Sequence, residues 1–230
     1  ELLVTAGGLL GADRVPARPA SPPAAASAQG LASDDVTFGR LADAASSTRT
    51  SLLVGYVEAC ATGVFLATQL IERSGRAIAG YRCTHLADRR YDPGTWLTVA
   101  PCAGVRLGLM LDDDLLVPEV ARALALAGAE LLIVQCTGSS DPCAAPESED
   151  EMLRAVARCR AFENATPLVV VAPNGGFAVD HRGDAVPMIQ NREGIALVSL
   201  EPGAGTARFR RPELYRRLLV VDEEAAGRAG

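Results

Sequence analysis

Residues 105–135, VRLGLMLDDDLLVPEVARALALAGAELLIVQ, contain two apolar runs separated by a segment with helical periodicity. Val105–Leu111 predicts a central strand, and Leu131–Gln135 predicts a second buried strand. Residues 118–129 predict the helix between them, because Pro118 suits a first helical turn and Gly128 suits a helix end. A strand, a helix and a second strand in this order are typical of an α/β protein.

The same alternation continues on both sides of this stretch. We predict a mixed sheet covered by helices in one domain, residues 1–220, with a tail at 221–230. Residues 13–35 are rich in proline, alanine and serine and predict a loop, ordered or disordered. Periodicity does not choose between one doubly wound sheet and two stacked sheets between helix layers. Further strands are expected at Leu2–Val4, 52–57, 64–71, 76–81, 96–99, Leu168–Ala172, 177–179 and 195–200, and helices at 38–47, 150–163 and 211–219, with a turn at 174–176.

Charge and hydropathy exclude several classes of partner. The net charge is −6 and the basic residues are spread along the chain, which argues against nucleic acid. The arginine run at 208–217 is interpreted as a solvated helix face or a subunit contact. No stretch reaches the roughly 20 apolar residues that cross a bilayer. All 22 basic residues are arginine, so a mechanism that needs a lysine ammonium cannot run on this chain alone.

The cysteines show neither a CxxC pair nor metal-ligand spacing with the two histidines, His85 and His181. We therefore predict reduced, mostly buried thiols, no metal site, no cofactor and a cytoplasmic location. No leader is visible, and the start at Glu1 is consistent with a trimmed N-terminus. Cys136, which follows the strand Leu131–Gln135, is interpreted as a small buried residue.

Four segments together resemble the nitrilase superfamily, also called the carbon–nitrogen hydrolases. Asp114, Pro118, Glu119 and Arg122 match that family's nucleophile segment, but Asp112 holds the position of its attacking cysteine. In residues 80–86, GYRCTHL, five residues match a Tyr-Arg-Lys-Thr-His-Leu segment, and Cys83 replaces the catalytic lysine. Residues 2–10, LLVTAGGLL, resemble the strand that ends in Phe-Pro-Glu, with Gly7 in place of the glutamate base. Residues 160–164, RAFEN, match the family's Arg-Ala-x-Glu-Asn.

The resemblance covers most of the chain and implies a four-layer α-β-β-α sandwich. The family's first strand and first helix are expected to be missing. Family members pair so that two sandwiches form one larger assembly, so the resemblance implies an oligomer of protein subunits.

The substitutions at Gly7, Cys83 and Asp112 remove the chemistry that the family uses. There, a glutamate activates the thiol and a lysine stabilises the negative charge that develops after its attack. Glycine offers no base and a thiol is not a cation. The neighbouring carboxylates Asp113 and Asp114 would also repel an oxyanion. We therefore expect a catalytically inactive protein with a structural or regulatory role, in a homo-oligomer or together with an active enzyme.

Two other hypotheses remain open. The chain could be a divergent amide or nitrile hydrolase with a relocated nucleophile such as Cys83, which also stands two residues from His85 in a possible thiol–imidazole pair. Alternatively, an acidic pocket around Asp112 and Asp113, with Cys83, His85 and Cys136 as further candidates, could bind a cation or another small ligand. A metal on residues 112–114 is disfavoured, and Asp114 is expected to cap a helix or bond local backbone. Glu119 is interpreted as a first-turn carboxylate.

Overall fold

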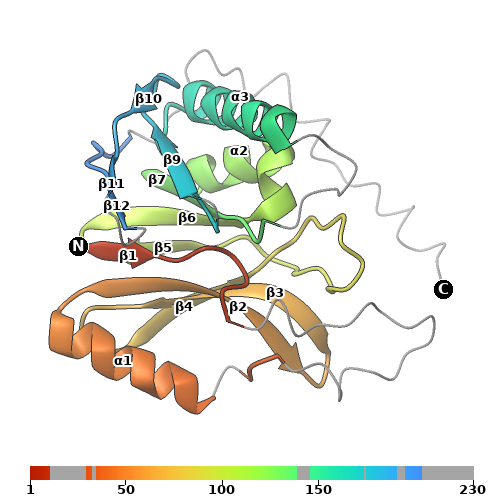
Figure 1. Ribbon diagram of the computed structural model, residues 1–230, viewed down its shortest axis with the longest axis vertical. Coiled ribbons are helices and arrows are strands. Elements are labelled where there is room, and N and C mark those ends of the chain that lie inside the picture. Colours follow the sequence, from red (N-terminus) through yellow and green to blue (C-terminus); the bar gives the residue numbers. More distant parts are fainter. Residues whose placement is uncertain (11–29, 33–34, 139–145, 174, 191–194, 204–230) are drawn as a thin grey trace.

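Three separate apolar clusters hold the chain together, and each lies between two layers of secondary structure. In the computed structural model, the described residues are 1–10, 30–32, 35–138, 146–173, 175–190 and 195–203. Figure 1 shows the resulting order of layers: helix α1, a four-stranded sheet, a six-stranded sheet, and helices α2 and α3. The chain therefore forms the expected α-β-β-α sandwich with two stacked sheets.

The four-stranded sheet has the order β1-β2-β3-β4 and carries α1 on its outer face. β1 pairs in parallel with β2 and forms one edge of this sheet, whereas β2–β3 and β3–β4 are antiparallel. The elements are β1 (Leu2–Val4), α1 (Val36–Thr48), β2 (Ser51–Cys60), β3 (Gly63–Ile71) and β4 (Ala77–Arg82).

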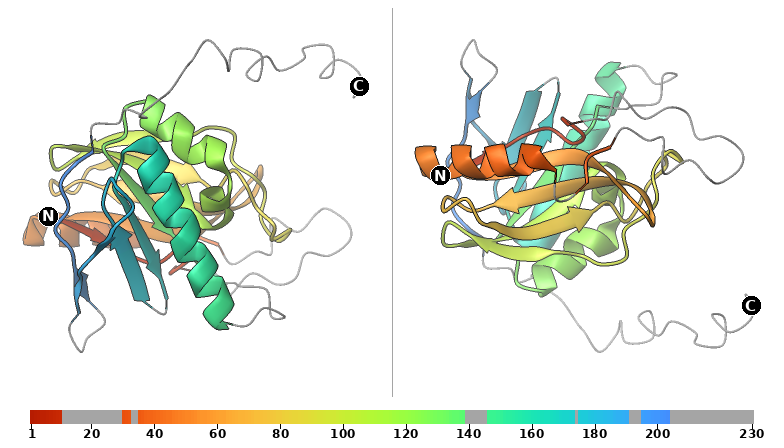
Figure 2. Two further views of the ribbon diagram at one scale, coloured as in Figure 1. Left: turned by 90° about the horizontal axis from the view of Figure 1, so that it is seen from above. Right: turned by 90° about the horizontal axis from the view of Figure 1, so that it is seen from below.

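The six-stranded sheet has the order β10-β9-β8-β7-β6-β5, with β6, β7 and β8 parallel to one another. Seen from above, α2 and α3 lie across it, and seen from below, α1 lies across the other sheet (Figure 2). The elements are β5 (Val99–Cys102), β6 (Val105–Leu111), the 3-10 turn η2 (Asp112–Leu116), α2 (Pro118–Leu126), β7 (Leu131–Gln135), α3 (Pro146–Asn164), β8 (Leu168–Ala172), β9 (Gly175–Val179) and β10 (Ala185–Val186), followed by a separate pair, β11 (Ile189–Gln190) and β12 (Ala196–Leu197).

The alternation of side chains along β6 explains how one strand serves two interfaces. Leu107, Leu109 and Leu111 belong to the cluster between the two sheets, while Met110 belongs to the cluster beneath α2 and α3. Gly108 also faces the helices, because a Cβ there would lie 2.7 Å from the Leu132 side chain. Because glycine has no side chain, α2 packs closely against β6 at this position, where a Cβ would lie 3.1 Å from the Leu124 Cβ.

The strand expected at residues 96–99 is displaced toward the C-terminus. β5 begins at Val99, and the Trp96 side chain is largely exposed. Ala103 and Gly104 both have positive φ and form a two-residue turn that fixes the pairing of β5 with β6. Pro101 is accommodated because β5 is an edge strand.

The other expected elements differ mainly in length. The strand expected at 195–200 is reduced to the two residues of β12, and α3 begins four residues earlier than the expected 150. The helix expected at 211–219 and most of the loop expected at 13–35 lie outside the described residues. Within the described part of the chain, no helix combines the length and apolar character needed to cross a membrane.

Candidate functional site

Asp114 is the centre of a hydrogen-bond network at the end of β6. Its side chain is fully buried, and Oδ2 accepts from the Tyr81 hydroxyl at 2.7 Å and from the Leu111 amide at 3.0 Å. Oδ1 accepts from the Thr84 hydroxyl at 2.8 Å and from the His85 amide at 3.0 Å. The expectation that Asp114 bonds local backbone is confirmed. The network fixes the segment that follows β4 against the turn that follows β6.

Cys83 lies inside this network. Its side chain is fully buried, and Sγ lies 3.1 Å from the Leu111 carbonyl oxygen, 3.3 Å from the His85 carbonyl oxygen and 3.4 Å from Asp114 Oδ2. Burial, and then the nearby Asp114 charge, raise the pKa of the Cys83 thiol well above its ordinary range. A thiol in this state is a hydrogen-bond donor and not a nucleophile.

The thiol–imidazole pair that the sequence left as one possibility is not formed. Cys83 contacts the backbone carbonyl of His85, while the His85 ring nitrogen Nδ1 lies 2.9 Å from Thr84 Oγ1 and 3.2 Å from Asp114 Oδ1. Residues 83 and 85 would point to the same face only if both lay in a strand, which would require β4 to continue beyond residue 83. β4 ends at Arg82, so the strand geometry assumed for the pair does not apply.

Asp112 occupies the sharp bend between β6 and the turn η2. It has φ of 41°, a left-handed conformation that is costly for a residue with a side chain and is often found at functional sites. Its Oδ1 accepts from the Thr137 amide and its Oδ2 from the Thr137 hydroxyl, both at 2.7 Å. Burial raises the pKa of Asp112 to about 6, although the Thr137 hydrogen bonds oppose the shift. Asp112 thus ties the end of β6 to the segment after β7.

Asp113 points to a different part of the molecule. Its Oδ2 accepts from the Ala87 amide at 2.7 Å, in the segment that follows β4. Asp112 and Asp113 are thus engaged with different segments, and the single pocket expected around both carboxylates is not formed by these contacts. No group of three metal-ligating side chains occurs among the described residues.

The corner occupied by Gly7 has no room for a side chain. The Gly7 amide donates to the Cys136 carbonyl oxygen at 2.9 Å, and a Cβ at Gly7 would lie 2.8 Å from the Gln135 carbonyl oxygen. Backbone atoms of the six-stranded sheet therefore fill the space that a base at residue 7 would need.

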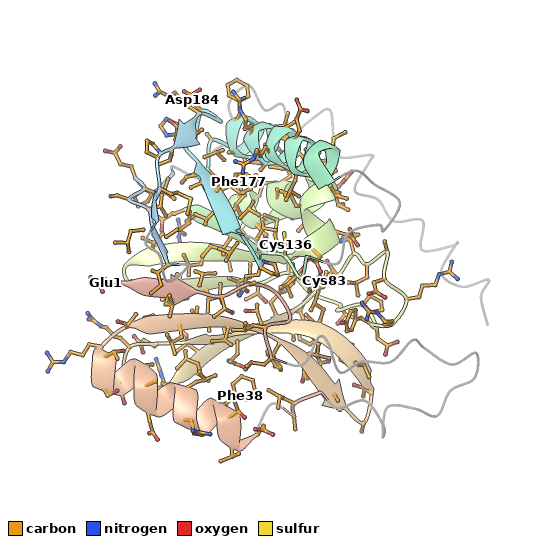
Figure 3. The ribbon with its side chains drawn as sticks, in the orientation of Figure 1. Glu1, Phe38, Cys83, Cys136, Phe177 and Asp184 are labelled. Atoms are coloured by element: carbon orange, nitrogen blue, oxygen red, sulfur yellow. The ribbon has the colours of Figure 1, made fainter. Side chains whose placement is uncertain are left out.

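Cys136 is nearly fully buried, as the sequence suggested, although it was also a pocket candidate. Burial, followed by the charges of Asp112 and Asp113, raises the pKa of its thiol to about 12. Figure 3 shows both thiols in the interior; Cys83 belongs to the apolar cluster between the two sheets and Cys136 to the cluster beneath α2 and α3. Neither thiol has the lowered pKa of a reactive cysteine.

Sequence reasoning missed two polar residues at this corner, Thr137 and Gln135. Gln135 is buried between the sheets, and its Nε2 donates to the Thr5 carbonyl oxygen at 2.8 Å and to the Leu53 carbonyl oxygen at 3.3 Å. Both residues follow the apolar run of β7, where polar side chains commonly mark the functional edge of a parallel sheet. That position was the available signal. Glu119, by contrast, lies in the first turn of α2 as predicted.

A surface hollow of about 860 Å³ lies beside this network. It is formed by the segment after β4, residues 84–93, and by residues of η2 and the start of α2. His85 and Asp113 line it, but Gly7, Cys83, Asp112 and Cys136 are not among its lining residues. Of the expected pocket residues, His85 and Asp113 are thus brought together at this hollow.

A model of the carbon–nitrogen hydrolase family matches residues 7–207. The chain belongs to the carbon–nitrogen hydrolase family. The fold agrees, because an amidase of the nitrilase superfamily from Nesterenkonia AN1 is similar over 95% of this chain and 84% of its own, with a TM-score of 0.71 and 22% identity. The carbon–nitrogen hydrolase from Helicobacter pylori gives a TM-score of 0.69 at 19% identity, over 81% of this chain and 76% of its own.

Curated relatives of this carbon–nitrogen hydrolase-family chain are more similar in sequence over shorter stretches. A protein described as a hydrolase in the pqqF 5′ region of Pseudomonas protegens is 34% identical over 139 residues, 58% of this chain and 46% of the relative. An N-carbamoylputrescine amidase from Solanum tuberosum is 25% identical over 81% of this chain and 74% of the relative. The match spans less than half the length of the first of these relatives.

Proposed function

We propose that this chain is a carbon–nitrogen hydrolase-family protein that does not carry out the family's cysteine-based hydrolysis. The observation that carries the proposal is the state of Cys83, at the position where the resemblance places the family's lysine. Its thiol is fully buried, has a raised pKa and donates into the network around Asp114. It supplies neither a cation nor a thiolate to any substrate.

The other two positions support the same proposal. A base at residue 7 would collide with the Gln135 carbonyl, and Asp112 presents a carboxylate that is already held by Thr137. An oxyanion formed near Asp112 would meet negative charge and no lysine, because the chain contains none. The retained Asp114 network supports the bend itself, so the fold does not depend on the missing chemistry.

For such a protein, a structural or regulatory role in an assembly of subunits is the function that the site supports best. The outer layer of α2 and α3 offers apolar side chains for a subunit contact: Leu126 and Phe162 are 46% and 58% exposed. A contiguous patch of exposed apolar side chains marks an interaction surface, and these two residues would contribute to one. The partner is a second copy of this chain or an active relative.

A turnover assay tests the loss of catalysis. The purified protein is incubated with an aliphatic amide, a nitrile and an N-carbamoyl amine, and ammonia release is measured against an equal amount of heat-denatured protein. We expect no release above that control. Turnover that disappears in Cys83→Ala contradicts the proposal, provided that the variant keeps the native circular dichroism spectrum.

A second test concerns the assembly. Phe162→Asp places a charge on the outer layer, and Val36→Asp places the same charge on α1, where Val36 is 77% exposed. We expect light scattering to show a smaller particle for Phe162→Asp and an unchanged particle for Val36→Asp. A wild-type monomer at all concentrations would count against the oligomer.

One observation favours a second candidate, a divergent amide hydrolase. Several relatives are described as amidases, and the Thr137 hydroxyl lies 2.7 Å from the Asp112 carboxylate, whose pKa of about 6 suits a general base. Thr137 Oγ1 would attack the amide carbon while Asp112 takes its proton. The carbon–nitrogen bond would then break as Asp112 returns the proton to the leaving amine, and water would hydrolyse the acyl ester. Turnover lost in Thr137→Val and retained in Cys83→Ala would support this candidate.

A further inference from the structure

The hollow beside the Asp114 network contains an imidazole that is held from one side only. The His85 side chain is 46% exposed, and its Nδ1 faces the fully buried Asp114 carboxylate and the Thr84 hydroxyl. A neutral imidazole carries one N–H. If Nδ1 keeps it for Asp114, Nε2 is left as a lone-pair acceptor on a residue that lines the hollow. A buried carboxylate that fixes the ring in this way is a common means of orienting a histidine toward a ligand.

The charges around the hollow favour a cation over an anion. The ionisable lining residues are His85, Asp88, Arg89, Tyr91, Asp92 and Asp113, and they include three carboxylates and one guanidinium. Asp88 is paired with Arg90 at 2.6 Å, which neutralises one carboxylate. After that pairing, the carboxylates of Asp92 and Asp113 remain against the Arg89 guanidinium, and Asp113 Oδ2 accepts from the Ala87 amide. The net charge of −6 adds a long-range attraction for cations.

The remaining lining is apolar and gives the ligand a place for a hydrocarbon body. Leu86, Leu116 and Val117 line the hollow, and Leu116 is 49% exposed. A hollow of about 860 Å³ lies within the usual range for small-molecule sites. Exposed leucine beside an oriented imidazole and a carboxylate is the combination that a small amphipathic cation would recognise.

We propose that this hollow binds a small primary amine with an apolar body, whose ammonium group donates to His85 Nε2 and lies against the Asp113 carboxylate. The site is separate from the three family positions at Gly7, Cys83 and Asp112. It therefore stands whether or not the chain turns over an amide. It replaces the single acidic pocket expected from the sequence with one that uses Asp113 and not Asp112.

The test uses three probes of nearly one shape: benzylamine, benzyl alcohol and benzoate. The chain has two histidines, so the imidazole signals of His85 and His181 can be assigned by NMR from His85→Ala and His181→Ala. We expect benzylamine to shift the His85 signal saturably and to leave His181 unchanged. Benzyl alcohol should bind more weakly and benzoate weakest, because the probes differ in charge and little in size.

Two matched variants sharpen the test. Asp113→Asn keeps an oxygen that can accept the Ala87 amide but removes the charge, so benzylamine binding should weaken roughly three- to tenfold. Asp184→Asn removes an equivalent charge from the exposed turn between β9 and β10 and should change nothing. His85→Ala should weaken benzylamine binding about tenfold, measured by the ligand's own signals. Benzoate binding as tight as benzylamine, equal weakening by both aspartate variants, or no saturable binding overturns the proposal.

Discussion

Asp114 and Asp112 stand two residues apart on one turn, yet the structure uses them in opposite ways. Asp114 is fully buried and accepts hydrogen bonds from two hydroxyls and several backbone amides. Asp112 accepts from one residue, Thr137, and burial raises its pKa to about 6. The first carboxylate is held by hydrogen-bond donors from several segments, while the second is held by the amide and hydroxyl of a single residue. Two nearby positions on a tight turn can thus differ in role: Asp114 holds several segments of the fold together, and Asp112 makes few contacts that the fold requires.

The largest effect that would test this contrast is expected for Asp114→Ala. The substitution leaves the Tyr81 hydroxyl, the Thr84 hydroxyl and the Leu111 amide without their acceptor inside the protein. Each unsatisfied buried donor is costly, so we expect the free energy of unfolding to fall by about 3–5 kcal/mol. Urea denaturation followed by circular dichroism measures it. A loss below about 1 kcal/mol would show that water replaces the carboxylate and that the network is not a scaffold.

Gly7→Ala tests the second part of the contrast, the closed corner at the family's base position. The new Cβ would lie 2.8 Å from the Gln135 carbonyl oxygen, and backbone atoms cannot move aside as a flexible side chain can. We expect a loss of about 2 kcal/mol in the free energy of unfolding.

Gly39→Ala is the matched control for Gly7→Ala. Gly39 lies inside α1, and a Cβ there meets no atom within 4 Å. Because alanine has a higher helix propensity than glycine, the free energy of unfolding of this variant should rise by roughly 0.5–1 kcal/mol. Equal effects from both glycines would mean that the corner has room for a side chain.

The sequence was sufficient to predict the central strands but not the contacts that Gly7 and Asp112 make. Continuous apolar runs located β6, β7 and β8 with their observed bounds, since these strands are largely buried on both faces and bounded by turn residues. The assignment of residue 112 to the family's nucleophile position rests on its order relative to Pro118 and Glu119, and it stays a prediction. The partner Thr137 and the steric closure at Gly7 depend on strands that meet only in three dimensions, and no local pattern encodes them. The Ala103–Gly104 turn was missed because an alanine rarely adopts positive φ.

Asp112→Asn should produce a smaller effect, one that depends on pH. The folded-state pKa of Asp112 is raised from 3.8 to about 6, so the folded protein binds the proton more tightly than the unfolded chain. This stabilisation is complete below about pH 4 and is lost as pH rises through about 6. Asparagine is uncharged at every pH, so Asp112→Asn should lose this pH dependence. At pH 8 its free energy of unfolding should exceed that of the wild type by about 1–2 kcal/mol. Parallel stability curves for the two proteins between pH 4 and 8 would contradict the raised pKa.

The smallest effect is expected at the third aspartate of the same turn, Asp113. Its carboxylate accepts one backbone bond from Ala87 at a partly exposed site, and an asparagine oxygen can accept that bond equally well. Asp113→Asn should therefore change the free energy of unfolding by no more than about 0.5 kcal/mol in urea. A loss near that of Asp114→Ala would place Asp113 in the scaffold, and its charge could not then be assigned to the hollow. A near-neutral result would show that the Asp113 charge does not stabilise the fold, as expected for a carboxylate that binds a ligand.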